Sequence, residues 1–242
     1  MNLFSKRGRT LGILLFSSGM LVNILFFALL TWPGVEAYNY FGYKPAQQGL
    51  TSLRCPFFLT THETGQVTAS YSNPSRLTLN PQFQVEISSP DLSDRMVDTS
   101  PAIAPGETKQ LQWAITSNDL VFGRMILAEV YQSPVYNTPD RVGRCGTLWV
   151  DAPQLTGMQI FIGMLITGLL LTGLGWWLWM KNTPSNRAGR STVMSAMLAL
   201  TAIVLVGMIA GILGWWVIGV ACMVLSLLLV VSTLGHLIIA HG

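Results

Sequence analysis

The sequence predicts a membrane protein of mixed α and β structure, in which four transmembrane helices carry an antiparallel β-sandwich inserted between the first and second helix. Three observations lead to this prediction: four long apolar runs without charge, a polar block with strand-like alternation, and the confinement of every acidic residue to that block and its lead-in. Half of the residues are hydrophobic and only 10% are charged, whereas soluble domains are about 25% charged.

The four apolar runs lie at residues 10–32, 155–180, 191–213 and 215–239. Each exceeds about 18 residues without Asp, Glu, Lys or Arg, which is the pattern of a membrane-spanning helix. The first run is too long for a cleaved secretion signal, whose apolar region has about 7–15 residues, so we expect a retained anchor. The remaining segments are an N-terminal tail (1–9), a linker (33–53), the polar block (54–151) and a short loop (181–190).

The distribution of charge sets the predicted orientation. All eleven acidic residues lie between Glu36 and Asp151, whereas the tail and the short loop hold six basic residues and no acidic one. Because short loops rich in Lys and Arg stay in the cytoplasm, we expect a multi-pass protein of the cell membrane with both termini cytoplasmic and residues 33–154 exoplasmic. Topology accounts for these small basic clusters, so we expect membrane lipids as partners and no nucleic acid.

The polar block shows the alternation of β-strands. Apolar and polar residues alternate at 66–72, 82–88 and 110–116, as in strands with one buried and one wet face. Turn-forming residues such as Pro and Asn separate these runs. We expect further strands at 54–60, 125–132 and 144–150. Six or seven short strands in about 100 residues predict a sandwich.

Two motifs in the block carry a resemblance. VTASYSN at 67–73 is a strand that ends in Asn73, and IAPGET at 103–108 is a hydrophobic-x-Pro-Gly-Glu turn. This combination resembles the immunoglobulin-like, adhesion-type domains of exported prokaryotic proteins. The resemblance covers only the polar block, and it implies an immunoglobulin-like sandwich without implying a ligand.

Cys55 and Cys145 are the only cysteines of the polar block, and disulfides persist outside the cytosol. In the fold that the resemblance implies, the first and last strands can pair in parallel, so we expect a structural disulfide between these cysteines. The last strand would end at the second helix, and the first strand would therefore begin at the far end of the sandwich. We then expect the linker to run up one side as an extended strap and the disulfide to lie at the membrane-distal end.

The apolar runs also contain candidate packing and anchoring residues. Gly207-x-x-x-Gly211 would let another helix approach closely, and Asn23 is expected to hydrogen-bond to another helix, either of this chain or of a second subunit. Tryptophans near the ends of the runs are expected to anchor the helices at the membrane–water interfaces. These anchors are Trp32, Trp176, Trp177, Trp179, Trp215 and Trp216.

No stretch of the sequence points to catalysis. The three histidines (His62, His236 and His241) have no metal-ligand spacing to a carboxylate or a cysteine, and the acidic residues at 91–98 do not match a calcium loop. The sequence also has no P-loop, dinucleotide fingerprint or Gly-x-Ser-x-Gly motif. We therefore expect no catalytic residue, no cofactor and no metal.

These features favour a non-catalytic accessory or assembly subunit. It would pack with other membrane-protein subunits in a larger complex and contact an exoplasmic protein through its sandwich. Two alternatives stay open: an oligomeric channel or transporter lined by the last two helices, and a surface receptor or adhesion module that binds glycan or cell wall. The apolar runs carry few polar groups at their centres, which weighs against coupled transport.

Overall fold

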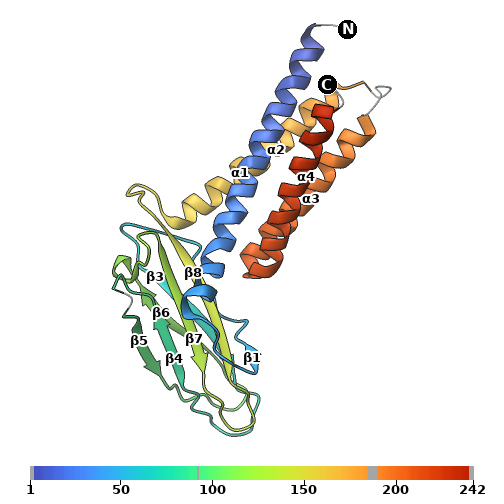
Figure 1. Ribbon diagram of the computed structural model, residues 1–242. Coiled ribbons are helices and arrows are strands. Elements are labelled where there is room, and N and C mark those ends of the chain that lie inside the picture. Colours follow the sequence, from blue (N-terminus) through green and yellow to red (C-terminus); the bar gives the residue numbers. More distant parts are fainter. Residues whose placement is uncertain (1–2, 92, 185–189, 240–242) are drawn as a thin grey trace. The chain divides into compact units, whose positions relative to one another are not determined.

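The computed structural model describes residues 3–91, 93–184 and 190–239. Within these residues it contains four α-helices and eight strands, and all strands lie between the first and second helix (Figure 1). The start of the predicted tail (1–2), the centre of the predicted loop (185–189) and His241 lie outside the described residues. The helices are α1 (Leu3–Phe41), α2 (Gly157–Asn182), α3 (Arg190–Leu213) and α4 (Trp216–Ile239). The strands are β1 (Gln48–Gly49), β2 (Phe58–Thr60), β3 (Gly65–Ser72), β4 (Phe83–Ile87), β5 (Arg95–Thr99), β6 (Thr108–Ile115), β7 (Met125–Gln132) and β8 (Arg141–Val150), with one 3₁₀ turn, η1 (Ser117–Asp119).

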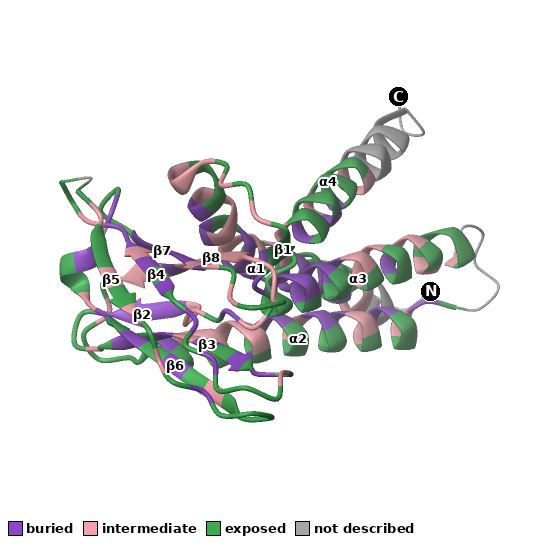
Figure 2. Cartoon of the chain, turned by 90° about the horizontal axis from the view of Figure 1, so that it is seen from below, coloured by how far each residue is buried: buried purple, intermediate pink, exposed green. Residues whose placement is uncertain are grey.

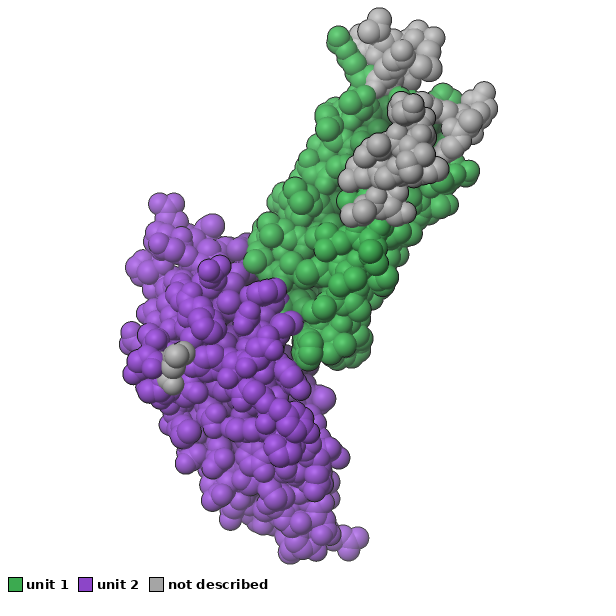
Figure 3. Space-filling model, in the orientation of Figure 1, with its two compact units in different colours: residues 1–31, 162–242 green, residues 32–161 purple. Residues whose placement is uncertain are grey.

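Three of the described helices, α1, α2 and α3, are long and apolar enough to cross a membrane. The described apolar part of α4, Trp216–Val230, is shorter. The chain forms two compact units, coloured separately in Figure 3. One consists of residues 1–31 and 162–242, and the other of residues 32–161. The second unit therefore holds every described strand, the C-terminal end of α1 and the first turn of α2.

The second unit contains a sandwich of two sheets. The larger sheet, which we call sheet A, runs in the order β1-β8-β7-β4-β5, with β2 also paired to β8, and the smaller sheet consists of β3 and β6. Both β1 and β2 lie parallel to β8, one at its start and one at its end, whereas all other strand pairs are antiparallel. The expected parallel pairing of the first strands with the last is therefore present.

The period-2 alternation of the sequence builds the core. Along β3, buried and exposed residues alternate almost without exception, and the same holds in the second half of β6 (Figure 2). Inward side chains of both sheets form one cluster, and burying each large one stabilises the fold by about 1.5–3 kcal/mol. The cluster includes Val67, Ala69, Tyr71, Phe83, Val85, Ile87, Leu111, Trp113, Ile115, Ile126, Ala128 and Val130.

The two motifs that carry the family resemblance are joined by one buried side chain. Asn73 is fully buried, and its Nδ2 donates to the carbonyl oxygens of Leu77 (2.8 Å), Ile103 (2.9 Å) and Ala104 (3.1 Å). The backbone N–H of Gly106 donates to the carbonyl of Asn73 at 3.0 Å. The asparagine thus ties the end of β3 to the turn between β5 and β6, because its amide satisfies carbonyls that a turn leaves unpaired.

The predicted linker at 33–53 is wrong over its first part. Helix α1 does not end at Trp32 but continues through Pro33 to Phe41. A proline inside a helix removes one backbone hydrogen bond and normally kinks or ends the helix, so the sequence favoured a stop there. The helix persists because its last turns pack on sheet A, where Ala37 is fully buried against Val121, Met125 and Leu127. Only residues 42–53 remain as a connection without helix.

Candidate functional site: the charged outer face of sheet A

A row of charged residues crosses the outer face of sheet A. Glu86 on β4, Glu129 on β7 and Arg144 on β8 are successive cross-strand partners. Directly paired residues of neighbouring strands project from the same face, so this row places two carboxylates side by side. Like charges in such a position repel each other, and the fold must supply positive charge to compensate.

Lys44, just beyond the end of α1, supplies that charge. Its Nζ donates a hydrogen bond to Glu86 Oε1 at 2.7 Å. The same Nζ forms an ion pair with Glu129 Oε1 at a distance of 2.6 Å. Arg144 Nε donates to the other carboxylate oxygen of Glu129. The Glu129 side chain is 1% exposed, and a buried charge of this kind is tolerated only when it is paired. The four groups therefore form a charge-neutral cluster of two carboxylates and two cations.

The cluster holds its lysine in the charged form. Burial by itself lowers the pKa of Lys44, but the contacts with Glu129 and Glu86 outweigh burial, and the net effect raises its pKa above the ordinary value. The guanidinium of Arg144 lies 5.0 Å from the centre of the Tyr38 ring, a cation–π distance. Arg144 Nη2 is buried without a hydrogen-bond partner in the described part of the chain, so the aromatic face is its compensating contact.

The C-terminal end of α1 covers this face. Gly146 on β8 makes the close approach possible, since a Cβ atom there would lie 2.4 Å from the carbonyl oxygen of Pro33. Further along, the hydroxyl of Tyr40 donates to Asp94 Oδ1 at 2.7 Å. The Tyr38 ring adds a cation–π contact with Arg144. Close packing, a cation–π contact and a hydrogen bond thus hold residues 33–41 against the sandwich.

A second polar contact holds the start of α2. Glu63, in the turn between β2 and β3, accepts at Oε2 from the Thr60 hydroxyl (2.8 Å), the Thr60 N–H (3.0 Å) and the N–H of Gly157 (2.8 Å). Burial raises the pKa of Glu63, but the hydrogen bond from Gly157 and those from Thr60 outweigh it, so the pKa is lowered. Gly157 is the first residue of α2, and a carboxylate at a helix N-terminus satisfies its unpaired N–H groups.

Sequence reasoning missed Glu63, because it lies in a short turn between two strands where a polar side chain is expected to face solvent. A local signal does mark the helix start: Thr156 and Gln159 form a capping box, in which Thr156 N–H donates to Gln159 Oε1 and Gln159 N–H donates to Thr156 Oγ1. No local signal could have found Glu63, which lies 94 residues from Gly157 in sequence.

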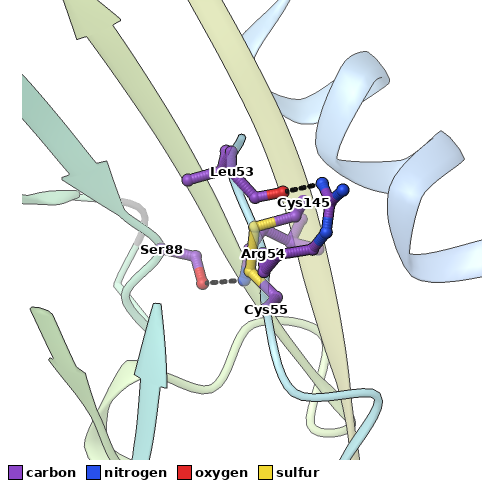
Figure 4. The surroundings of a disulfide bond; sticks show 6 residues. Leu53, Arg54, Cys55, Ser88 and Cys145 are labelled. Carbon is purple, nitrogen blue, oxygen red and sulfur yellow. Dashed lines mark hydrogen bonds between the residues drawn. A yellow bond between two sulfur atoms is a disulfide. The ribbon is translucent and has the colours of Figure 1, made fainter. Parts of the chain in front are cut away.

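The predicted disulfide is present. Cys55 and Cys145 are joined, with a Cα–Cα distance of 5.8 Å, and Figure 4 shows the bond between β8 and the segment that leads into β2. The expected place at the far end of the sandwich is wrong, because Cys145 lies in the middle of β8. The parallel pairing starts earlier than expected, with Gln48 of β1 beside Arg141. By Cys55 the chain has already run about halfway along β8.

The predicted helix-packing residues lie at helix contacts. Asn23 Nδ2 donates to Thr172 Oγ1 of α2 at 3.0 Å. A Cβ atom on Gly207 would lie 3.2 Å from Cys222 of α4 and 3.3 Å from Phe27 of α1, and one on Gly211 would lie 3.1 Å from Leu30. All of these partners belong to this chain.

The closest helix contact was not predicted. A Cβ atom on Gly12 of α1 would lie 2.6 Å from the backbone nitrogen of Trp179, and one on Gly175 of α2 would lie 2.2 Å from that of Phe16. Gly19 meets the backbone of Thr172 in the same way. Helices α1 and α2 thus touch backbone to backbone at positions that accept no side chain.

The six tryptophans predicted as interface anchors differ in how far their side chains are exposed. Trp32, Trp177 and Trp215 are more than half exposed, and Trp176 and Trp216 are partly buried. Trp179 is only 3% exposed, since it lies at the close contact with Gly12. Trp179 therefore packs within the chain, and the anchor roles of all six tryptophans at the membrane–water interfaces stay predictions.

An apolar cavity of about 170 Å³ lies among α1, α2 and α3. Its walls include Met20, Leu169, Val204 and Leu205. Asn23 also borders it: its Nδ2 donates to Thr172, and its Oδ1 is buried without a hydrogen-bond partner in the described part of the chain.

Within the described residues, no group of three or more His, Cys, Asp or Glu side chains could hold a metal ion. The charged groups at the outer face of sheet A contact one another or the end of α1. What this arrangement does physically is to fix two helix ends to the sandwich.

Comparisons with known proteins do not name a family. No family model matches the chain, and no curated protein matches it. Among solved structures, the chain is similar to a CARDB domain from Pyrococcus furiosus solved with di-metal ions, at 12% identity and a TM-score of 0.33, over 41% of this chain and 90% of that one. It is also similar to the C-terminal domain of wzt (9% identity, TM-score 0.29, 46% and 82% of the two chains) and to a β-glucosidase from Listeria innocua (16% identity, TM-score 0.29, 41% and 16%). Likenesses at this level do not identify a relative.

Proposed function

We propose that this protein is a non-catalytic accessory or assembly subunit of a membrane complex. Its helices cross the cell membrane with both termini in the cytoplasm and pack against other subunits. Its immunoglobulin-like sandwich stands on the exoplasmic side and contacts a protein partner there.

The observation that carries the proposal is that the C-terminal end of α1 and the start of α2 are both held to the sandwich by specific contacts. The end of α1 lies on sheet A, with Gly146 against Pro33 and Tyr40 bonded to Asp94. The start of α2 is bonded to Glu63. A domain on a flexible tether would need none of these contacts. These contacts order the two segments that lead into and out of the sandwich, and a pre-ordered domain lowers the entropic cost of binding a partner.

The state of the charged groups supports a structural role. A catalytic acid or base must reach its reactant within hydrogen-bond distance. Glu129 is 1% exposed and is contacted by Lys44 and Arg144, and Glu63 already accepts three hydrogen bonds. These groups are engaged within the chain, which favours an assembly function for the sandwich.

The proposed orientation has two supports. The disulfide between Cys55 and Cys145 is of a kind that persists outside the cytosol, and all acidic residues lie between Glu36 and Asp151. A membrane-impermeant maleimide on intact cells tests the orientation. It should label Gln112→Cys on the exposed face of β6 and leave the matched variant Lys181→Cys unlabelled until the cells are opened. The reverse pattern would contradict the orientation.

Purification of the tagged protein from its native membrane in mild detergent tests the function. We expect a particle clearly heavier than the 26.5 kDa chain, with at least one other protein in fixed stoichiometry by light scattering and mass spectrometry. A lone monomer would contradict the proposal. Solute flux through liposomes holding the purified protein would instead favour the channel alternative, and glycan binding without any protein partner would favour the receptor alternative.

A further inference from the structure

The smaller sheet has an outer edge along β6. This sheet consists of β3 and β6 alone, whereas sheet A has six strands. In an antiparallel pair, residues whose backbone groups bond across the pair alternate with residues whose backbone groups point away from it. The N–H of Asn73, just after β3, donates to the carbonyl of Glu107 at 2.9 Å. The register of the pair therefore directs the odd-numbered residues of β6 towards β3 and the even-numbered residues outward.

The outer edge of β3 is closed by the chain itself. Thr68 and Arg54 exchange two backbone hydrogen bonds, at 2.9 and 2.8 Å. Two residues further along, the hydroxyl of Ser52 accepts from the N–H of Ser70 at 3.2 Å and donates to its carbonyl at 2.7 Å. The segment that leads into β2 thus satisfies the outward backbone groups in the second half of β3.

The outer edge of β6 is open over residues 108–112. At its C-terminal end the outward carbonyl of Ala114 accepts from Nη2 of Arg95 at 2.8 Å. Within the described residues, the outward N–H and C=O groups of Thr108, Gln110 and Gln112 have no hydrogen-bond partner. The side chains of these three residues are uncharged and exposed. Three donors and three acceptors therefore stand in a row, at the spacing of a strand.

Sheet A also ends in a free edge, at β5, but that edge is protected. The N–H of Ser88 donates to the carbonyl of Leu127, so the even-numbered residues of β4 bond to β7 and the odd-numbered ones bond to β5. The outward residues of β5 are therefore Met96 and Asp98. A short strand and a charge on the edge are two features that protect free edges from pairing. β5 has both, whereas β6 has eight residues and its charged Lys109 points to the inner face.

We propose that the β6 edge binds an extended segment of the exoplasmic partner protein, which adds a third strand to the smaller sheet. The inference rests on the proposed function, because it names the surface through which the sandwich contacts that partner. Alternating N–H and C=O groups at strand spacing are complementary to the backbone of another extended chain. A glycan or a lipid headgroup carries no such row. Because Arg95 takes the carbonyl of Ala114, the paired segment has about five residues.

The inner face predicts the side chains of the segment. Its residues opposite Lys109 and Leu111 would point inward, because directly paired residues share a face. Leu111 belongs to the core, and Val97 of β5 lies half-buried at the margin of that core. Trp113 Nε1 donates to Thr99 Oγ1 at 3.4 Å, so the inner face of β6 meets β5. We therefore expect an apolar residue opposite Leu111 and an acidic one, two positions away, opposite Lys109.

A second copy of this chain does not suit the β6 edge. A symmetric pair of β6 strands would be antiparallel, since a closed two-fold contact uses the same patch on both copies. Ile115 at the end of β6 pairs with Gly65. Gly65 follows by a short turn from Thr60, the partner of Val150 at the end of β8. Each β6 thus runs towards the end from which α2 begins, so the α2 helices of two paired copies would begin at opposite ends instead of entering one membrane.

The test compares two proline variants of the full-length protein in its native membrane. Gln110→Pro removes an outward N–H and puts a ring in the plane of pairing, a position that a strand edge tolerates. We expect the thermal unfolding midpoint to change by no more than about 4 °C. The amount of partner recovered in mild detergent should fall at least about tenfold, since one backbone bond is lost and its neighbours are blocked. The matched variant Asp98→Pro makes the same change on β5 and should retain the partner.

A photo-crosslinking residue at position 112 gives a second readout, which does not depend on the proline variants. In intact membranes it should form one product with one other protein, mapped by mass spectrometry to a single extended segment. The same residue at position 98 should not form this product. Crosslinks only to lipid, only to glycan or only to a second copy of this chain would each overturn the inference.

A synthetic peptide of the mapped sequence then tests the backbone pairing directly. It should bind to the purified full-length protein. Methylating the peptide nitrogens that face β6 should weaken binding at least about tenfold, because each loses its N–H. Methylating the nitrogens between them should have little effect. Equal effects of the two methylation patterns would show that the contact is made by side chains and would overturn the inference.

The outcomes separate the inference from the proposed function. If the wild-type protein purifies in a complex that Gln110→Pro leaves intact, the inference fails and the proposed function stands. If Gln110→Pro lowers the unfolding midpoint by more than the expected change, the crosslink at position 112 and the methylated peptides decide. If the wild-type protein is a lone monomer and position 112 forms no crosslink, both fail.

Discussion

Helix α1 packs in two different ways along its length. Its first half meets α2 backbone to backbone, at Gly12 and Gly19, where no side chain fits. Its last turns meet sheet A through large and charged side chains, with Tyr38 over Arg144 and Tyr40 bonded to Asp94. Between apolar helices in a lipid setting, hydrophobic burial drives little association, so close van der Waals contact and a few hydrogen bonds must suffice. Where the helix packs on a polar domain, burial of aromatic rings and ion pairs contribute to the contact in addition to close packing.

The difference teaches that one helix can follow two sets of packing rules. Removing a charge should be the most damaging change at the sheet contact, whereas adding a single methyl group should be the most damaging change at the helix contact. The variants below test this contrast.

The largest effect is expected at the sheet contact. Glu129→Ala removes the carboxylate that faces both Arg144 and Lys44, and leaves a buried guanidinium without its partner. Breaking a buried ion pair in this way costs about 3–5 kcal/mol. Urea unfolding of the full-length protein in mild detergent, followed by tryptophan fluorescence to which the buried Trp113 contributes, measures this loss.

Glu86→Ala is the matched control, because Glu86 shares Lys44 but its side chain is 19% exposed. Its loss should cost no more than about 1 kcal/mol. Equal losses for the two variants would show that burial does not set the strength of the cluster.

Sequence patterns predicted the features that depend on local periodicity. The alternation at 66–72 became β3 with its buried Val67, Ala69 and Tyr71, because a strand has a fixed period of two. The apolar runs became long helices for an equally local reason. The pairing of Cys55 with Cys145 was predicted too, since the block holds no other cysteine.

The remaining features depend on contacts between distant residues. The extension of α1 beyond Pro33 rests on the burial of Ala37 under sheet A, which overrides the local preference of proline. Glu129 lies in an otherwise apolar strand, and its partner Lys44 comes from the segment after α1. The sequence does not distinguish Gly12 and Gly175 from the other glycines of the apolar runs. Glycine is required at these two positions only because the backbone of the neighbouring helix lies so close in the fold.

The next largest effect is expected at the helix contact. Gly12→Ala places a methyl group 2.6 Å from the backbone nitrogen of Trp179, so the helices must separate. Overpacking of this kind costs about 1–3 kcal/mol. Unfolding in mixed micelles of mild detergent and sodium dodecyl sulfate, followed by circular dichroism, measures the change.

Gly173→Ala is the control on the facing helix, since a Cβ atom there meets nothing within 4 Å. It should be neutral or stabilising by up to about 1 kcal/mol, because alanine is the better helix former. If both variants destabilise equally, the close contact is not what holds α1 to α2.

A smaller, pH-dependent effect is expected where α2 begins. The pKa of Glu63 is lowered in the folded protein, so its contribution to stability is fully present above the unfolded value of about 4.3. That contribution is lost as the pH falls through the lower folded pKa. Glu63→Gln should cost about 0.5–2 kcal/mol at pH 7, in the range of helix caps. Thermal unfolding at pH 7 and pH 3 measures both effects.

The variant and the wild-type protein should become more alike at pH 3, because the wild-type carboxylate is then losing its charge. A difference that stays constant from pH 7 to pH 3 would mean that the charge of Glu63 does not stabilise the start of α2.

The smallest effect is expected for the hydrogen bond between Asn23 of α1 and Thr172 of α2. Asn23→Val removes the hydrogen bond to Thr172, and such bonds between apolar helices contribute about 0.6 kcal/mol on average. A double-mutant cycle with Thr172→Val isolates the pair, since the two side chains touch directly. We expect a coupling below 1 kcal/mol by the micelle assay, smaller than the cost of Gly12→Ala. A coupling larger than that cost would reverse the contrast between the two ends of α1, because polar bonding would then hold the helices together and the glycines would only permit it.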